Sequence, residues 1–286
     1  MKKKSLAVKK IKHKSLLNYL KNNRINNIFK GYSDCLNKYI DKKDKLAVAI
    51  SGGPDSLALA YITKCYVLKN NLNSKFFIVD HGLRKYSSKE AKSVKQILSK
   101  FDIVCEILKW NGKKPKSNIQ AIARAKRYNL IYKECLKDKI SFILIAHHID
   151  DLYENFIIRL LRGSGLNGLV SFSQITTNYN DKLKILRPLI NFKKNELQNV
   201  TKKVFKFKIE DPSNKNINFK RTRIRNLINY LEFEGLNLEK LRLTIRNLGD
   251  SNFTINHYVI NNIKNNSKYF ESKKYYILNS NFFDQP

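Results

Sequence analysis

The chain has 286 residues, with 56 lysines and arginines against 23 aspartates and glutamates, so its formal net charge at pH 7 is +33. Hydrophobic residues make up 42% of the chain and aromatic residues 11%, which is enough to bury a substantial core and argues against disorder throughout. So basic a chain favours a polyanionic partner, with nucleic acid as the first candidate and a generic cationic surface as the alternative.

The cysteines and the apolar runs exclude several protein classes. No two of the four cysteines form a C-x-x-C pair, so the spacing predicts neither a zinc knuckle nor an iron–sulfur site: Cys35, Cys65, Cys105 and Cys135. No apolar run is long enough to span a bilayer, and no signal-peptide hydrophobic region follows the basic start. We expect no membrane association and a reducing compartment, either the cytoplasm of a bacterium or the stroma of a plastid.

The chain order begins with a basic lead-in, residues 1–44, in which apolar residues recur at helical spacing. Short continuous apolar runs then follow at residues 46–50, 76–79, 103–108, 142–146 and 185–190. Runs of this kind are typical of strands that are buried on both faces, as in a parallel sheet.

Helical patterns lie between these runs, at residues 56–68, 87–100, 118–136 and 151–161. The second of them opens with Ser87-x-x-Glu90, which predicts a capping box. Alternating strands and helices predict an α/β fold, a doubly wound, Rossmann-like parallel sheet, and ligands of such sheets bind beyond the carboxyl ends of the strands.

The last third of the chain is different. Residues 193–207 predict a basic amphipathic helix, a loop follows at 209–220, and the next helix begins with the very basic segment 221–225. We expect a catalytic domain at 45–229 and a short helical region with an aromatic tail at 230–286.

The strongest motif follows the first predicted strand and opens the first predicted helix, Ser51-Gly52-Gly53-Pro54-Asp55-Ser56. Glycines let the backbone approach an oxyanion closely, and free amides at a helix N-terminus attract phosphate. The two serines add hydroxyl donors, and proline is tolerated in a first helical turn. An ordinary glycine-rich turn is the bland alternative, and the motif lacks the Gly-Lys-Ser/Thr of a Walker A loop.

Asp55 carries a further implication. A carboxylate beside bare phosphate is unfavourable, so its presence predicts a bridging Mg²⁺ ion.

This hexapeptide resembles the PP-loop of the ATP pyrophosphatase superfamily. Further motifs, in the same order and over roughly residues 45–226, resemble those of the tRNA(Ile)-lysidine synthase family: Val79-Asp80-His81-Gly82-Leu83-Arg84, Ala123-Arg124-x-x-Arg127-Tyr128, Ala146-His147-His148-Ile149-Asp150-Asp151-x-x-Glu154, Arg162-Gly163-Ser164-Gly165, Arg187-Pro188-Leu189, and Glu210-Asp211-Pro212-Ser213-Asn214 followed by Arg221 and Arg225.

The resemblance implies an ATP-dependent carbon–nitrogen ligase. In that family, ATP adenylates the C2 oxygen of the wobble cytidine of a CAU-anticodon tRNA(Ile) and pyrophosphate leaves. The ε-amine of free L-lysine then displaces AMP, which gives lysidine and converts AUG reading into AUA reading. The partners implied are that tRNA and lysine, and a homodimer is compatible with them.

The resemblance also assigns residues. It places Asp55, Asp151, Glu154 and Arg124 among the catalytic groups, and Asp55 and Asp151 on Mg²⁺. ATP would contact the whole loop together with two residues after the second strand, so the nucleotide set is Ser51, Gly52, Gly53, Pro54, Asp55, Ser56, His81 and Gly82. The tRNA contacts implied are Arg162, Arg221 and Arg225.

The residues themselves leave alternatives open. Asp151 and Glu154 share a helix face, and such a pair suits Mg²⁺ or an ammonium group; a zinc site or helix capping are the other interpretations. His81 is equally explained as a turn histidine, and the arginines as solvated basic helix faces. Rival functions are a tRNA 2-thiolase, an amide-forming synthetase and a non-catalytic RNA-binding protein.

Overall fold

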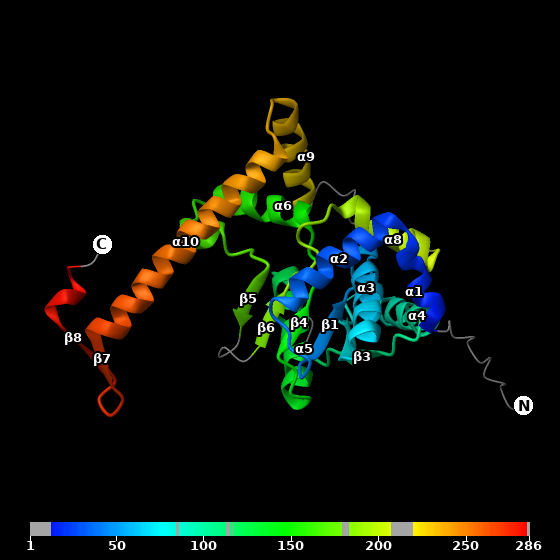
Figure 1. Cartoon of the computed structure of the whole chain (residues 1–286), viewed down its shortest axis with the longest axis horizontal. Coiled ribbons are helices and arrows are strands. Elements are labelled where there is room, and N and C mark those ends of the chain that lie inside the picture. The colour runs from blue at the N-terminus through cyan, green and yellow to red at the C-terminus, as the bar shows by residue number, and fades with distance from the viewer. Residues whose placement is uncertain are drawn as a thin grey trace, which may run out of the picture. The chain divides into compact units, whose positions relative to one another are not determined.

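The computed structural model describes residues 13–83, 86–112, 115, 117–178, 183–206 and 220–284 (Figure 1). These residues form two compact units. The first holds the described residues up to 152 and from 174 to 206, and the second holds 153–173 and 220–284. No helix among the described residues is long and apolar enough to cross a membrane.

A six-stranded sheet forms the centre of the first unit, in the order β3-β2-β1-β4-β6-β5 (Figure 1). Its strands are β1 (Lys45–Ile50), β2 (Asn73–Asp80), β3 (Cys105–Lys109), β4 (Phe142–Leu144), β5 (Ile175–Asn178) and β6 (Leu183–Leu186). All neighbouring pairs are parallel except β5 with β6. The predicted parallel sheet is therefore confirmed, and the antiparallel edge strand β5 was not expected.

Alternate residues of each strand enter two separate apolar cores, because strand side chains point to opposite faces. Along β1, Leu46, Val48 and Ile50 enter one core, whereas Ala47 enters the other. Burial on both faces explains the continuous apolar runs of the sequence.

Helices cover both faces of this sheet, so the sheet is doubly wound. The larger core is built with helices α1 (His13–Asn18), α2 (Asn23–Asn37), α3 (Pro54–Asn70), α4 (Ser87–Ser99) and α8 (Lys194–Phe205). Helix α5 (Ile119–Lys137) packs on the other face through Ile131, Tyr132 and Cys135.

Helix α3 is the most deeply buried of these helices. Its residues from Leu57 to Ile62 have no exposed surface, so this helix is apolar on nearly every side. The polar groups that enter the core with it are hydrogen-bonded: Tyr61 Oη donates to Leu16 O at 3.0 Å, and Thr63 Oγ1 lies 2.8 Å from Tyr32 Oη. The helix that begins at the glycine loop is therefore held rigidly.

The described part of the basic lead-in belongs to this same core. Leu16, Ile25 and Leu36 are buried in it, so this segment does not form a unit of its own. Residues 1–12 and the predicted loop up to residue 219 lie outside the described residues.

The turn after β2 is organised by the carboxylate of Asp80. Its oxygens accept hydrogen bonds from Ser87 Oγ at 2.7 Å, from the Gly82 amide at 3.0 Å and from Ser88 Oγ. Ser87 therefore does not cap α4, whose N-cap is Tyr86, and the predicted capping box with Glu90 is wrong. The Ser87 hydroxyl instead donates to the charged carboxylate of Asp80 at the end of β2.

The second unit contains the C-terminal part of α6 (Ile149–Leu160), α7 (Leu166–Leu169), α9 (Lys220–Phe233) and the long α10 (Leu238–Asn266). A hairpin of β7 (Ser267–Phe270) and β8 (Tyr275–Leu278) follows α10 directly. The helical character of this region is confirmed, and its aromatic tail includes the strands of the hairpin, which was not expected.

We expect Asp80→Asn to destabilise the protein by about 1–2 kcal/mol at pH 7, because charged hydrogen bonds are stronger than neutral ones. Burial alone would raise the pKa of Asp80, but the donors from Ser88, Ser87 and Gly82 outweigh it and the pKa lies below its ordinary value. A depressed carboxyl pKa stabilises the fold above the unfolded-state pKa, and this stabilisation is lost as the pH falls through the folded-state pKa.

Urea unfolding at pH 7 and near pH 3 measures this effect. The stability gap between wild type and Asp80→Asn should narrow at the lower pH. The exposed Asp34 on α2 supplies the control, since Asp34→Asn should change stability little at either pH. A gap that is equal at both pH values would contradict the role given to the Asp80 charge.

Candidate functional site

The glycine loop lies at the carboxyl end of β1, directly before α3. Gly53 is the N-cap of α3 and Pro54 is in its first turn, and because Gly53 has no side chain, no side-chain cap covers the first amides of the helix. Ser56 Oγ donates to Gly53 O at 2.8 Å and Thr201 Oγ1 of α8 donates to Pro54 O at 2.6 Å. The loop thus presents main-chain donors at a helix N-terminus in a fixed conformation, the arrangement that binds phosphate.

The two glycines of the loop have different roles. Gly52 has a φ of +88°, and a Cβ there would lie 3.1 Å from Val94 Cγ2, so both its backbone and its packing favour glycine. Gly53 has a φ of −73°, and a Cβ would meet only Ser51 Oγ at 3.7 Å. Gly52 therefore has a backbone conformation that favours glycine, whereas Gly53 has an ordinary one, and its missing side chain instead keeps the adjacent amides accessible.

Ser51 and Ser56 also differ. Ser51 is exposed, whereas Ser56 is 3% exposed and its hydroxyl is already used within the turn. Of the two predicted hydroxyl donors, only Ser51 is accessible to a ligand in this conformation.

Three carboxylates surround the imidazole of His148, which follows β4. His148 Nε2 lies 3.7 Å from Asp55 Oδ2 and 3.5 Å from Asp151 Oδ2, and Nδ1 lies 3.3 Å from Asp150 Oδ2. Because β1 and β4 are parallel neighbours, their carboxyl ends bring the glycine loop and this acidic segment together. Asp55 and Asp151, which are far apart in the sequence, therefore both lie beside His148.

Burial and mutual charge set the protonation of this cluster. Burial raises the pKa of Asp55, against the opposing charges of His148 and Lys194. Burial also lowers the pKa of His148, but the hydrogen bond with Asp150 and the charges of Asp151 and Asp55 outweigh it, so its pKa is raised. Burial of Asp150 is likewise outweighed by His148 and the Lys194 amide, and its pKa falls to about 2.

Asp55 fits the requirement of a magnesium ligand. Its Oδ1 atom is buried without a hydrogen-bond partner, and such an atom is costly unless a cation or donor binds it. Mg²⁺ is commonly held by one or two carboxylates together with phosphate oxygens and water. Among the described residues no group of three or more His, Cys, Asp or Glu side chains could hold a metal ion.

His81 lies at the carboxyl end of β2 and contacts α5. Arg127 Nε donates to His81 Nε2 at 3.1 Å, and Trp110 packs edge-on against the ring. Burial and the Arg127 charge lower the pKa of His81, so the neutral ring accepts at Nε2 and carries its proton on Nδ1. His81 Nδ1 is buried and has no hydrogen-bond partner, so its proton is free to be donated to a ligand. Gly82 follows with a φ of +60° and open space beside its Cα.

Arg127 and Arg187 make side-chain hydrogen bonds within the fold. Arg124 is exposed, and its Cζ atom lies 5.2 Å from the centroid of the Tyr128 ring. Arg187 is 6% exposed and donates to His147 Nδ1 and to Thr176 Oγ1, each at 3.1 Å. Arg124, which the sequence analysis predicts to be catalytic, is thus the arginine of α5 whose side chain is exposed.

Glu154 belongs to the second unit, where it pairs with α9. It is 2% exposed, and its Oε1 accepts from Arg225 Nε at 2.5 Å while Oε2 lies 4.0 Å from Arg221 Nε. The sequence analysis gave Glu154 to catalysis and both arginines to tRNA, and the structure brings these three residues into contact with one another.

Arg162 ends the turn that closes α6. The amides of Arg162 and Ser164 both donate to Arg159 O, at 3.1 Å each, and Gly163 has a φ of +68°, so this motif is a hydrogen-bonded helix end rather than a freely flexible loop. The Arg162 side chain is exposed, and its contact with tRNA stays a prediction.

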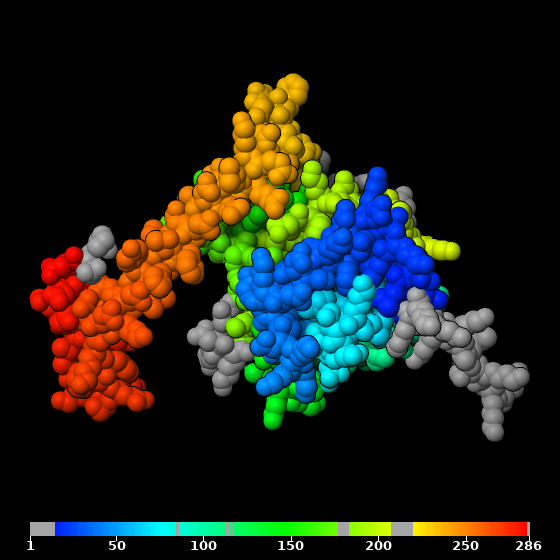
Figure 2. All heavy atoms as spheres, in the orientation of Figure 1, coloured from blue at the N-terminus to red at the C-terminus, as the bar shows by residue number. Residues whose placement is uncertain are grey.

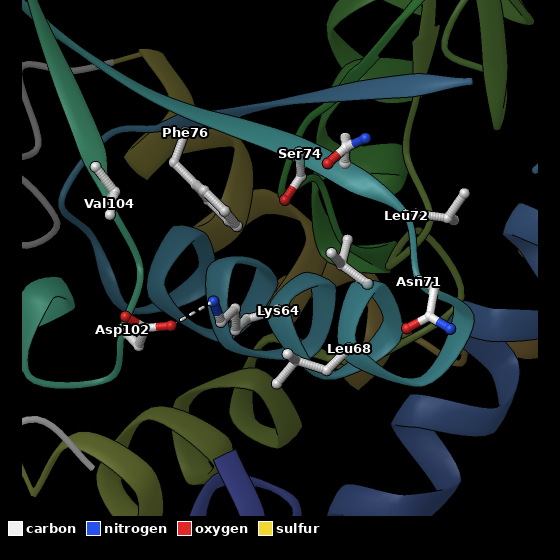
Figure 3. Close-up of a pocket in the computed structure, with 10 residues that line it drawn as sticks. Lys64, Leu68, Asn71, Leu72, Ser74, Phe76, Asp102 and Val104 are labelled. Carbon is white, nitrogen blue, oxygen red and sulfur yellow. Dashed lines mark hydrogen bonds and ion pairs between the residues drawn. The ribbon is translucent and has the colours of Figure 1, made fainter. Parts of the chain in front are cut away.

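A hollow of about 370 Å³ lies at the opposite end of α3 from the glycine loop (Figure 3). Leu68, Asn71 and Ser74 line it, and the ion pair of Lys64 with Asp102 lies at its edge at 3.0 Å. It contains none of the predicted site residues.

Sequence reasoning missed two groups that support the site. Thr201 fixes the glycine loop to α8, and the Lys194 amide donates to Asp150 Oδ2 at 2.9 Å. No local pattern marks either residue, because each acts on a partner far away in the sequence.

Comparison with known proteins agrees with this geometry. The family model described as "PP-loop domain" matches residues 16–231. The tRNA(Ile)-lysidine synthase of Wolbachia pipientis wMel is 34% identical over 233 residues, which cover 79% of this chain and 53% of that protein. That of Orientia tsutsugamushi (strain Boryong) is 36% identical over 236 residues, which cover 78% and 53%. The chain thus spans about half the length of these curated relatives.

A solved structure shows a similar fold. The U34-tRNA thiolase NcsA from Methanococcus maripaludis aligns with a TM-score of 0.66 and 18% sequence identity, over 80% of this chain and 81% of that chain. The match to the family model covers most of the chain and includes the glycine loop and the acidic cluster. The resemblance seen in the motifs is confirmed, and the chain belongs to the PP-loop domain family.

Proposed function

We propose that this chain is an ATP-dependent ligase that joins lysine to the wobble cytidine of a CAU-anticodon tRNA(Ile). The glycine loop beside the buried, unpaired Asp55 oxygen is the observation that carries the proposal. The relatives named tRNA(Ile)-lysidine synthase support the substrate, and the net charge of +33 supports an RNA partner. The compartment proposed is one that holds tRNA, the cytoplasm or a plastid stroma.

ATP is proposed to bind with its phosphates against the amides at the N-terminus of α3, with the Ser51 hydroxyl as a further donor. The His81 Nδ1 proton, buried and unpaired, would donate to the nucleoside. Asp55 and Asp151 would hold Mg²⁺, which neutralises phosphate charge when bound. Arg124, exposed on α5, supplies a positive charge for the reacting phosphate.

The proposed reaction has two steps. The C2 oxygen of the cytidine attacks the α-phosphorus, the α–β bridging bond breaks, and pyrophosphate leaves with the electron pair. The lysine ε-amine then forms a bond to C2, and AMP leaves with the former C2 oxygen. Reading of a splayed, unpaired base is the common way in which proteins recognise RNA sequence.

A carboxylate is needed in the second step, because a lysine ε-amine is mostly protonated at neutral pH and is then no nucleophile. Lysine is proposed to lie near Asp151 and Glu154, and a carboxylate of this acidic cluster accepts its proton. Glu154 was assigned to the same chemistry, but its carboxylate is paired with Arg225, so contact with lysine requires this ion pair to open.

The cysteines argue against the rival tRNA 2-thiolase. All four are buried on separate elements, and burial raises the pKa of Cys35 and Cys65 to about 11 and that of Cys105 and Cys135 to about 12. A sulfur carrier needs an accessible thiolate, which these environments disfavour.

We expect Asp55→Ala to abolish lysidine formation and to leave tRNA affinity nearly unchanged. The substitution removes the proposed magnesium ligand but none of the basic surface. Mass analysis of tRNA nucleosides after incubation with ATP and lysine measures the first effect, and filter binding measures the second.

The exposed Asp34→Ala is the matched control, because it removes the same charge far from the loop in sequence and should keep full activity. Wild-type activity in Asp55→Ala would contradict the proposed ligand. Absence of lysidine with the wild-type protein, together with tight tRNA binding, would favour the non-catalytic RNA-binding alternative.

The two arginines of α9 should behave differently. Arg221 has half of its side chain exposed, so Arg221→Gln should weaken tRNA binding by severalfold and flatten its salt dependence. Arg225→Gln leaves the buried Glu154 without its closest partner, so it should also destabilise the protein by about 2–4 kcal/mol.

Salt titrations of tRNA binding and urea unfolding separate these effects. The double variant Glu154→Gln/Arg225→Gln should recover much of the lost stability, because the unpaired charge is removed. If Arg225→Gln unfolds at the wild-type urea concentration, the ion pair does not have the proposed structural role.

A further inference from the structure

The C-terminal hairpin carries aromatic pairs on both of its faces. In its register Tyr269 lies opposite Tyr276, and Phe270 lies opposite Tyr275. The ring centroids of the first pair are 4.7 Å apart, and those of the second are 5.3 Å apart with an interplanar angle of 18°. Adjacent residues of a strand point to opposite faces, so each face of the ribbon has one pair of rings.

Three of these four rings are open to solvent, and Phe270 is half-buried. Tyr276 is 60% exposed, Tyr269 is 49% exposed and Tyr275 is 40% exposed. Figure 2 shows the hairpin in red at the end of α10. Clustered exposed aromatics of this kind contribute little to a core and mark an interaction surface.

Lysines accompany the rings. Lys268, Lys273 and Lys274 are exposed on the hairpin, where Glu271 is the single acidic residue between Ser267 and Leu278. Lys268 Nζ lies 5.4 Å from the centroid of the Phe270 ring. Proteins that bind single-stranded nucleic acid without reading its sequence combine two elements: aromatic surfaces on which bases stack, and cations that pair with phosphates.

We propose that this hairpin binds unpaired nucleotides of the RNA substrate, with bases stacked on the exposed tyrosines and phosphates paired with the lysines. The inference extends the proposed function, because it adds an RNA-binding surface in the second unit to the arginines of α9. A ring has a face for any base, so this surface would add affinity rather than sequence specificity.

Charge favours RNA over a second copy of this chain as the partner. Two identical hairpins would bring three lysines each to one interface, in a chain whose net charge is already +33. A polyanion with stackable bases complements both the lysines and the rings.

The test uses the full chain and a fluorescein-labelled single-stranded RNA of 12 nucleotides, with anisotropy as the readout and without ATP or lysine. Tyr275→Ala/Tyr276→Ala should weaken binding on the order of 10-fold, since each stacked base contributes substantially to affinity. Tyr275→Phe/Tyr276→Phe keeps both rings and should bind as wild type does.

Two further variants complete the design. Lys268→Gln/Lys273→Gln/Lys274→Gln should lower the slope of log K against log salt by up to about 2. Phe253→Ala removes an aromatic side chain on α10 that is 74% exposed but has no flanking lysine, and it should leave RNA affinity unchanged. Circular dichroism confirms that each variant is folded.

The outcomes are distinguishable. Equal RNA affinity of the Ala and Phe double variants overturns the proposal, and so does a wild-type dimer in light scattering that the Ala variant alone disrupts while RNA affinity stays constant. Hairpin-dependent RNA binding without lysidine formation by the wild type would support this surface and reject the ligase. Lysidine formation by the wild type, together with RNA binding that does not depend on the hairpin, would support the ligase and reject this surface.

Discussion

The concentration of negative charge at the carboxyl ends of β1 and β4 is the constraint on which the candidate site depends. Three carboxylates share one histidine there, and one of their oxygens, Asp55 Oδ1, is buried without a partner. Packing does not require such a group, and burial alone makes its charge costly. The amides of α3 beside it attract anions, so the same place is prepared for a phosphate and for the cation that accompanies it.

The parts of this arrangement that depend on local sequence could be predicted. A strand that is buried on both faces has a continuous apolar run in its sequence. All five parallel strands could therefore be predicted within a few residues of their observed bounds. The glycine loop follows one of these runs and opens a helix, which placed its amides without knowledge of the rest of the fold. The carboxyl ends of parallel strands lie at one edge of the sheet, and this rule places Asp151, which follows β4, at the same edge as the glycine loop.

The parts that depend on distant partners could not be predicted. Ser87 has the spacing of a capping box, but it donates to Asp80 from the end of a strand. Glu154 and Arg225 are 71 residues apart, and only the structure shows that they pair. The edge strand β5 is short, with polar residues at most of its positions, so it carries no apolar signal.

The four buried thiols have a practical consequence. They lie in α2, α3, β3 and α5 and so sample both faces of the central sheet. A thiol with a raised pKa inside a core reacts with an alkylating reagent only when its surroundings open. The rate of alkylation at each cysteine therefore reports how often that part of the sheet or its helices opens, without any introduced label.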